Sequence, residues 1–232
     1  MNYATKEQID ILRGLESSVV ANAIDRLGIR PSTTGFASAQ IRCLSPDAPR
    51  VVGHAVTCSE DTTTPRMTPG RGLADLYRAV AAIPAPSIIA IKDIGHDRLR
   101  SVHLGAVMAT ATSRLGAVGF LSDGAVRDID DIREKVPGYQ VFAAGVVPAE
   151  GAPHILEIGR YVEICGLGID HGDLLMMDSD GILSIPTEHI DDILRISKEI
   201  TDFERARFQY IFSDDFTIDG LVNDWRRPQS QL

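Results

Sequence analysis

Short apolar runs alternate along the chain with longer segments in which apolar residues recur at helical spacing. Runs rich in branched residues predict strands, and the periodic segments predict helices. We predict strands at residues 50–59, 87–91, 117–121, 140–144, 160–165, 173–178 and 182–185. We predict helices within residues 5–14, 19–27, 73–83, 102–115, 127–136 and 187–210. This alternation indicates an α/β fold whose strands run in mixed directions.

Several element ends are marked by capping and turn residues. Thr5, with Gln8 three residues later, predicts a capping box at the first helix, and Thr187 predicts the cap of the last. The Asp180-Gly181 pair predicts a hairpin turn between two strands. We interpret the nearby acidic residues of this hairpin, including Asp178, as turn residues.

Two polar segments interrupt the pattern. Residues 30–49 contain three prolines and scattered serine and threonine, so we predict a loop there. Residues 61–72 are rich in threonine and bounded by glycine and proline. We expect a mobile loop beside a binding cleft in this second segment, because connecting segments often carry ligand contacts. We expect residues 1–212 to form a single domain and the polar residues 213–232 to form an arm.

Residues 102–131 organise the rest of the chain. They predict a helix that Gly116 stops, a strand that is buried on both faces, and a glycine turn. Arg127 and Asp128 then stand where the next helix begins. Ligands of open α/β sheets gather outside the carboxyl ends of strands. We therefore interpret Arg127 as an anion clamp and Asp128 as a metal ligand.

Composition narrows the class of partner. The 232 residues carry a formal net charge of −9, which argues against a nucleic-acid-binding surface. No apolar run is long enough for a transmembrane helix, and the first residues lack the pattern of a signal peptide. The three cysteines, Cys43, Cys58 and Cys165, are far apart in the sequence. They fit packing roles in a reduced, cytoplasmic protein.

Three stretches resemble a known family: GAVGFLSDGAVRD, PGYQVFAAGVVP and HGDLLMMDSDGILSIP. Together they resemble the regulator of ribonuclease activity A family, which includes the 4-hydroxy-4-methyl-2-oxoglutarate/4-carboxy-4-hydroxy-2-oxoadipate aldolases. The likeness spans roughly residues 15–204. It implies an α/β/α sandwich of the swivelling-domain type with a mixed sheet. It also implies a homotrimer or a homohexamer with active sites at subunit interfaces. We expect the polar arm at residues 213–232 to pack on a neighbouring subunit.

One departure from the aldolases concerns the site itself. The aldolase members carry an acidic residue, a spacer of twenty residues, and then Arg-Asp. This chain keeps the spacer before Arg127-Asp128 but has Ala106 at the acidic position. Backbone N–H groups of Gly105, Ala106, Val107 and Met108 need no side chain to bind an anion, so they remain candidate substrate-binding groups.

The resemblance implies a divalent-metal-dependent lyase of the aldolase or decarboxylase type. Its substrate would be a small 2-oxo or hydroxy dicarboxylic acid, with pyruvate as a product and Mg²⁺ or Mn²⁺ as the cofactor. Such a reaction needs a cation, donors for the substrate carboxylate, and an acid or base. We assign Asp128 to the metal, Arg127 to the carboxylate, Asp131 to metal-bound water, and His103 to the missing proton donor.

Other interpretations of these residues stay open. Asp128 could be only a helix N-cap with Arg127 as its surface partner, and His103 only a structural residue. Asp97, beside His96 after a predicted strand, could replace the missing carboxylate. The last predicted helix offers two weaker candidates, Glu199 and Glu204.

Two other functions are alternatives to this lyase. A non-catalytic regulator that binds a ribonuclease or another protein is consistent with Ala106 and with the acidic composition. A family member with altered chemistry, such as a dehydratase, is consistent with Ala106 as well. We expect no nucleic-acid or membrane partner.

Overall fold

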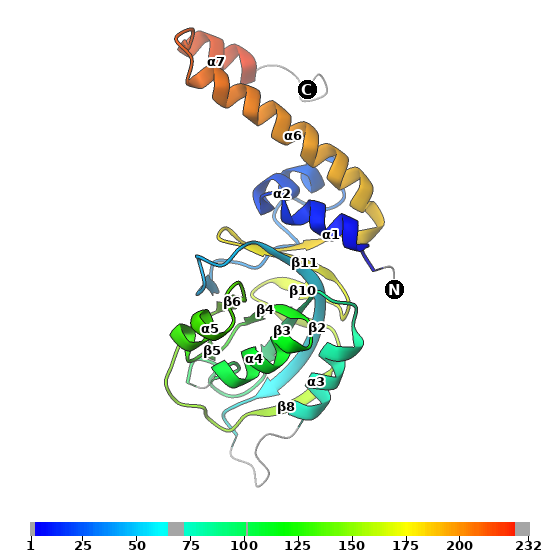
Figure 1. The fold of residues 1–232 in the computed structure, drawn as a ribbon, viewed down its shortest axis with the longest axis vertical. Helices are drawn as coiled ribbons and strands as arrows, with labels where there is room; N and C mark the ends of the chain where they lie inside the picture. Colours follow the sequence, from blue (N-terminus) through cyan, green and yellow to red (C-terminus); the bar gives the residue numbers. More distant parts are fainter. Residues whose placement is uncertain (1–2, 65–71, 101, 226–232) are drawn as a thin grey trace.

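A curved, mixed sheet built around one long strand forms the centre of the computed structural model (Figure 1). The structure describes residues 3–64, 72–100 and 102–225, and for residues 224 and 225 only the backbone. The strand order is β1–β6–β4–β3–β2–β11–β12, with β8 paired to the end of β2. The bounds are β1 Arg42–Cys43, β2 Val51–Asp61, β3 Ser87–Asp93, β4 Ala117–Ser122, β6 Gln140–Ala143, β8 His154–Ile158, β11 Leu174–Asp178 and β12 Gly181–Ile185.

Strand directions place the carboxyl ends of four strands at one edge. β2, β3, β4 and β6 run parallel, whereas β11 pairs antiparallel with the first half of β2 and β8 with its last residues. All eleven residues of β2 are buried, because the sheet is covered on both faces. Val52, Val56 and Cys58 face helices, whereas Val51 and Ala55 face a β-hairpin.

Helices cover one face of the sheet in two groups. Helices α3, α4 and α5 pack on the parallel strands, and α1, α2 and the first half of α6 pack on β11 and β12. The bounds are α1 Lys6–Arg13, α2 Ser17–Arg26, α3 Leu73–Ala82, α4 Ala106–Arg114, α5 Ile129–Lys135, α6 Ile190–Ile211 and α7 Ile218–Trp225. A 3-10 turn at Thr187–His189 precedes α6.

The opposite face is covered by a hairpin. Strands β9 (Val162–Ile164) and β10 (Leu167–Ile169) pair antiparallel, and their apolar side chains share a core with β3, β4 and β11. A separate parallel pair, β5 (Ala125–Val126) with β7 (Gly145–Val146), lies just before the Arg127-Asp128 pair. The predicted α/β class with a mixed sheet is confirmed, and the structure adds that the layer opposite the helices is this hairpin.

Most predicted elements are present, with small changes at their ends. The capping box at Thr5 is confirmed, and so is the hairpin turn that precedes Gly181. Strand β1 lies in the segment 30–49 that we predicted as a loop, and β8 and β10 lie where we predicted no strand. Thr187 begins the 3-10 turn, and α6 starts at Ile190. Residues 65–71 of the predicted mobile loop lie outside the described residues.

The predicted helix at residues 102–115 is wrong in its first turn. Val102 forms a β-bridge with Ala125, and the N–H of His103 donates to the carbonyl of Ala125. The N–H of Arg127 donates to the carbonyl of Leu104. Residues 102–104 are therefore extended, and α4 begins at Ala106. This shift brings the first turn of α4 beside Arg127 and Asp128.

Helix α6 extends well beyond the sheet and carries α7 at its far end (Figure 1). Its buried residues lie in its first eight positions, whereas Phe208 and Phe212 farther along are exposed. Helix α7 lies within the predicted arm, whose packing on another subunit stays a prediction. In the described part of the chain, no helix is long and apolar enough to cross a membrane.

Candidate active site

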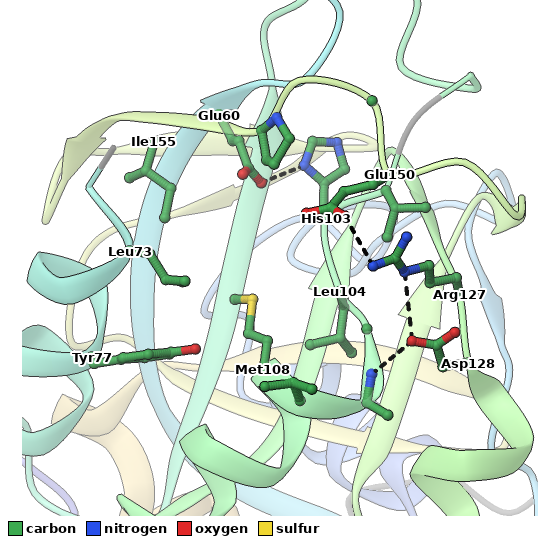
Figure 2. A pocket seen from close by; sticks show the side chains of 16 residues that line it. Glu60, Leu73, Tyr77, His103, Leu104, Met108, Arg127, Asp128, Glu150 and Ile155 are labelled. Atoms are coloured by element: carbon green, nitrogen blue, oxygen red, sulfur yellow. Dashed lines mark hydrogen bonds and ion pairs between the residues drawn. The ribbon is translucent and has the colours of Figure 1, made fainter. Parts of the chain in front are cut away.

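A cavity of about 590 Å³ lies between the carboxyl end of β2, helix α3 and the first turn of α4 (Figure 2). This volume suits a small molecule. One side of the cavity is apolar, and Figure 2 shows the polar groups gathered on the other side. The apolar lining comes from Leu73, Tyr77, Leu104, Met108 and Ile155, and the polar lining from Glu60, His103, Arg127, Asp128 and Glu150.

The first turn of α4 presents backbone donors at this cavity. The N–H of Ala106 donates to Asp128 Oδ2 at 3.2 Å. Within the described residues, the N–H groups of Val107 and Met108 have no acceptor. Free N–H groups at a helix N-terminus, together with the helix dipole, favour an anion. The predicted anion donors therefore line the cavity, and the side chain of Ala106 is not needed for this role.

Arg127 and Asp128 lie beside these donors. Arg127 Nε is 3.5 Å from Asp128 Oδ2, and its Nη2 donates to Glu150 Oε2 at 3.1 Å. Asp128 is the N-cap residue of α5 with a left-handed backbone (φ 59°), a conformation that Asp tolerates better than most residues. Its side chain does not cap α5 but reaches α4 instead. The carboxylate is 39 % exposed, so it can also reach a ligand.

His103 lies between two carboxylates at the upper end of the cavity. Its Nδ1 is 2.6 Å from Glu60 Oε2, and its Nε2 is 2.8 Å from Asp93 Oδ2. Burial alone would lower the pKa of His103, but the hydrogen bonds to Asp93 and Glu60 outweigh it and raise the pKa to about 9. The ring is therefore an imidazolium at neutral pH, and its side chain is fully buried.

Other predicted candidates lie away from this cavity. Asp131 pairs with Lys135 at 2.6 Å on the exposed side of α5. The Asp97 carboxylate accepts from the N–H of Leu99 in an exposed turn. Glu199 pairs with Arg195 on α6, which also carries Glu204. None of these carboxylates is among the described residues that line the cavity.

The fit of a divalent cation depends on Asp128. Among the described residues, no group of three or more histidine, cysteine, aspartate and glutamate side chains could enclose a metal ion. Mg²⁺ and Mn²⁺ do not require such a cage, because Mg²⁺ is usually held by one or two carboxylates and keeps several waters. An exposed carboxylate beside anion donors fits a hydrated cation that a bound oxo acid also coordinates. It does not fit a closed structural site.

Sequence reasoning missed Glu60, Glu150 and Tyr77 as lining residues. The sequence did mark Glu60, because two consecutive acidic residues, Glu60 and Asp61, end a strand that contains no other acidic residue. Asp93 ends the next strand in the same way. Glu150 lies in a loop and Tyr77 on a helix, and the sequence gives neither a distinguishing pattern.

The chain is similar to known proteins over most of its length. The model of the RraA-like family, described as Aldolase/RraA, matches residues 20–184. A Halalkalibacterium halodurans protein named "Putative 4-hydroxy-4-methyl-2-oxoglutarate aldolase" is 28% identical over 229 residues, which cover 98% of this chain and 100% of that protein. An uncharacterised protein of Methanocaldococcus jannaschii is 30% identical over 113 residues, covering 48% of this chain. The chain spans only about half of that relative, 53% of its length.

A solved structure shows the same fold. The Streptomyces coelicolor protein RraAS2, described as an unusual member of the RNase ES inhibitor RraA protein family, superposes with a TM-score of 0.70. The match covers 89% of this chain and 98% of that chain, at 20% sequence identity. At this identity the likeness concerns the fold alone.

Proposed function

The chain belongs to the RraA-like family, and from that premise we propose that it is a metal-dependent carbon–carbon lyase acting on a small 2-oxo dicarboxylic acid. One observation carries the proposal. Arg127, Asp128 and the free N–H groups of α4 face one cavity of the size of a small ligand. A cation site and an anion site side by side match an acid that carries a 2-oxo group next to a carboxylate.

Each group has a distinct role in this proposal. The planar guanidinium of Arg127 binds both oxygens of the substrate carboxylate. In doing so it exchanges its hydrogen bond to Glu150 for bonds to the substrate. The N–H groups of Val107 and Met108 bind a second carboxylate or an oxyanion. Asp128 holds Mg²⁺ or Mn²⁺ through its exposed oxygen. When bound, the cation polarises the 2-oxo group and stabilises negative charge that develops on it.

The apolar side of the cavity contributes a low-polarity environment. Leu73, Leu104 and Met108 limit access of water to the bond that breaks, so charge interactions inside the site are strengthened. We propose retro-aldol cleavage that releases pyruvate, with oxaloacetate decarboxylation as a second reaction of the same kind.

A pyruvate-release assay tests this proposal. Purified protein is incubated with Mg²⁺ or Mn²⁺ and with oxaloacetate or 4-hydroxy-4-methyl-2-oxoglutarate, and pyruvate is measured through a coupled reductase. We expect metal-dependent release that falls at least about 100-fold in Asp128→Asn, since the carboxylate acts at the reacting group. Asp130→Asn, an exposed neighbour on α5, is the matched control and should keep full activity.

Two results would count against the lyase. One is the absence of pyruvate at every metal concentration. The other is full activity in Asp128→Asn. Absence of pyruvate combined with no uptake of Mg²⁺ or Mn²⁺ in calorimetry would point to a regulator that binds another protein.

The proposed assembly is a homotrimer or homohexamer. It is supported by the family membership and by the exposed apolar residues on the projecting half of α6, Phe208 and Phe212. Light scattering after size exclusion should give a mass of three or six chains of 25.2 kDa. A monomeric mass at micromolar concentration would contradict the assembly.

A further inference from the structure

Three ionisable residues beside the cavity, Glu60, Asp93 and His103, have no role in the site of Arg127, Asp128 and the α4 N–H groups. Glu60 and Asp93 are direct partners in the parallel ladder of β2 and β3, so their carboxylates would repel each other. His103, from the extended segment before α4, lies between them and bonds to both. The cluster is held by three separate segments of the chain at the edge where the parallel strands end.

The two carboxylates differ in how firmly they are held. Asp93 Oδ1 accepts from the N–H of Gly95 at 2.7 Å, and its Oδ2 accepts from the Thr62 hydroxyl at 3.1 Å as well as from His103. Burial would raise the pKa of Asp93, but these bonds lower it overall. Asp93 is therefore a fixed, ionised group on the far side of the ring from Glu60.

Glu60 and His103 both line the cavity, and of these two side chains only that of Glu60 keeps any exposure, 6 % against 0 % for His103. Within the described residues, His103 is the hydrogen-bond partner of the Glu60 carboxylate, and Glu60 lines the cavity next to Ile155 (Figure 2). Burial raises the pKa of Glu60, and the charge of His103 offsets only part of that rise. A raised pKa makes the protonated form of a carboxyl group more accessible, which suits a residue that both accepts and donates a proton.

We propose that Glu60 is the acid–base residue of this cavity, with His103 as its proton partner and Asp93 as a positioning residue. The proposal rests on the proposed lyase function. It reassigns the proton transfer first attributed to His103, because the His103 side chain is fully buried whereas the Glu60 carboxylate keeps some exposure at the cavity. In this role Glu60 also supplies a carboxylate to a site in which Ala106 occupies the acidic position of the aldolases.

The proton balance is simple for a 4-hydroxy-2-oxo acid. The ionised Glu60 carboxylate takes the proton of the 4-hydroxyl group while the C3–C4 bond breaks. The electron pair of that bond moves to C3 and gives the enolate of pyruvate, and the other fragment leaves with a new carbonyl group. Protonated Glu60 then donates its proton to C3, which completes pyruvate and restores the carboxylate. No oxidant or other reactant is consumed.

Exchange of the methyl protons of pyruvate in D₂O tests this role directly. The full-length protein with Mg²⁺ is incubated with pyruvate, and loss of the methyl proton signal is followed by NMR. We expect exchange to fall at least about 100-fold in Glu60→Gln, the usual size of an acid–base contribution. Oxalate affinity should stay within about threefold, because Arg127 and Asp128 are unchanged. Glu157→Gln, an exposed glutamate on the adjacent strand β8, is the matched control.

The outcomes separate this inference from the proposed function. If the wild-type protein exchanges protons and Glu60→Gln exchanges them at the same rate, Glu60 is not the acid–base residue. If the wild-type protein exchanges no protons and releases no pyruvate, the lyase function fails and this inference fails with it. Thermal unfolding of each variant checks that a loss of exchange is not a loss of folding.

A second variant tests the coupling to His103. The ionisable groups around the Glu60 carboxylate are His103, Asp93 on β3 and His154 on β8. Removing the positive ring in His103→Gln should raise the pKa of Glu60 further. The rising limb of the pH–rate profile, which reports ionised Glu60, should therefore move to higher pH. An unchanged profile in a folded His103→Gln protein would show that the ring has only a structural role.

Discussion

At the scale of single residues, Gly105 controls the geometry of the Arg127-Asp128 pair. A Cβ atom at Gly105 would lie 2.9 Å from Asp128 Oδ2 and 3.3 Å from Arg127 Nε. The backbone of Gly105 has φ −129°, which alanine adopts without strain. We expect Gly105→Ala to fold normally but to displace the carboxylate and lower kcat/KM for pyruvate release at least about tenfold.

A matched glycine makes this a controlled experiment. A Cβ atom at Gly145, on β7, would meet nothing within 4 Å. Gly145→Ala should therefore keep both stability and activity. Equal activity of Gly105→Ala and Gly145→Ala would show that the position of Asp128 is not critical for the reaction.

The site residues close in sequence were predictable, and those brought in by long-range pairing were not. Residues 105–108 and Arg127-Asp128 follow from the strand-end rule and the family resemblance, and the structure places them at one cavity. Asp131 was assigned to metal-bound water at the same site, yet its partner in the structure is Lys135. Glu60 reaches the cavity only because β2 pairs with β3 and β8, and no local pattern encodes those pairings.

At the scale of elements, a hairpin residue anchors α2. The buried carboxylate of Asp178 accepts from the Ser17 N–H at 2.9 Å, from the Ser17 hydroxyl at 2.7 Å and from Arg50 Nε at 2.9 Å. These bonds lower the pKa of Asp178 although burial alone would raise it. Asp178 was predicted as a turn residue, and it also joins the hairpin to the first turn of a helix far away in sequence.

Urea unfolding measures the strength of this anchor. Asp178→Ala leaves the buried N–H and hydroxyl of Ser17 and the partly buried Nε of Arg50 without an acceptor, which costs about 2–3 kcal/mol of unfolding free energy. Asp180→Ala, in the exposed turn of the same hairpin, should change stability by about 0.5 kcal/mol or less. Equal effects of the two substitutions would contradict the anchoring role.

Element types were more predictable than element ends. Apolar periodicity identified β2, β3, β4, β11 and the long helix α6. It failed at residues 102–104, where pairing with residues 125–127 outweighs the helical pattern. It also failed at β8 and β10. Glycines surround β10 and a proline precedes β8. Both features are typical of loops, so the pattern alone does not predict a strand at either position.

At the scale of the whole molecule, the cluster around His103 makes stability depend on pH. The pKa of His103 is about 9 in the folded protein and about 6.5 for an unperturbed histidine. Folding therefore takes up a proton between these values, and the stabilisation is complete below about pH 6.5. It is lost as the pH rises through 9. The raised pKa of Glu60 acts in the same direction, because a carboxyl group whose pKa is raised on folding also loses stability as the pH rises above its ordinary pKa.

Unfolding free energies at pH 6.5 and above pH 9 test this linkage. The wild-type protein should lose about 1–3 kcal/mol over this range, since one unit of pKa shift corresponds to about 1.4 kcal/mol. His103→Gln should lose clearly less, because it lacks the group that releases the proton. The same pH dependence in both proteins would show that His103 is not the group responsible.

The most direct measurement of the proposed site is a crystal structure of the protein with Mg²⁺ and oxalate, a stable mimic of the enolate of pyruvate. We expect one oxalate carboxylate on the Arg127 guanidinium, the N–H groups of Val107 and Met108 facing oxalate oxygens, and the cation on Asp128. Oxalate bound elsewhere, with only water between Arg127, Asp128 and the first turn of α4, would contradict the proposed function.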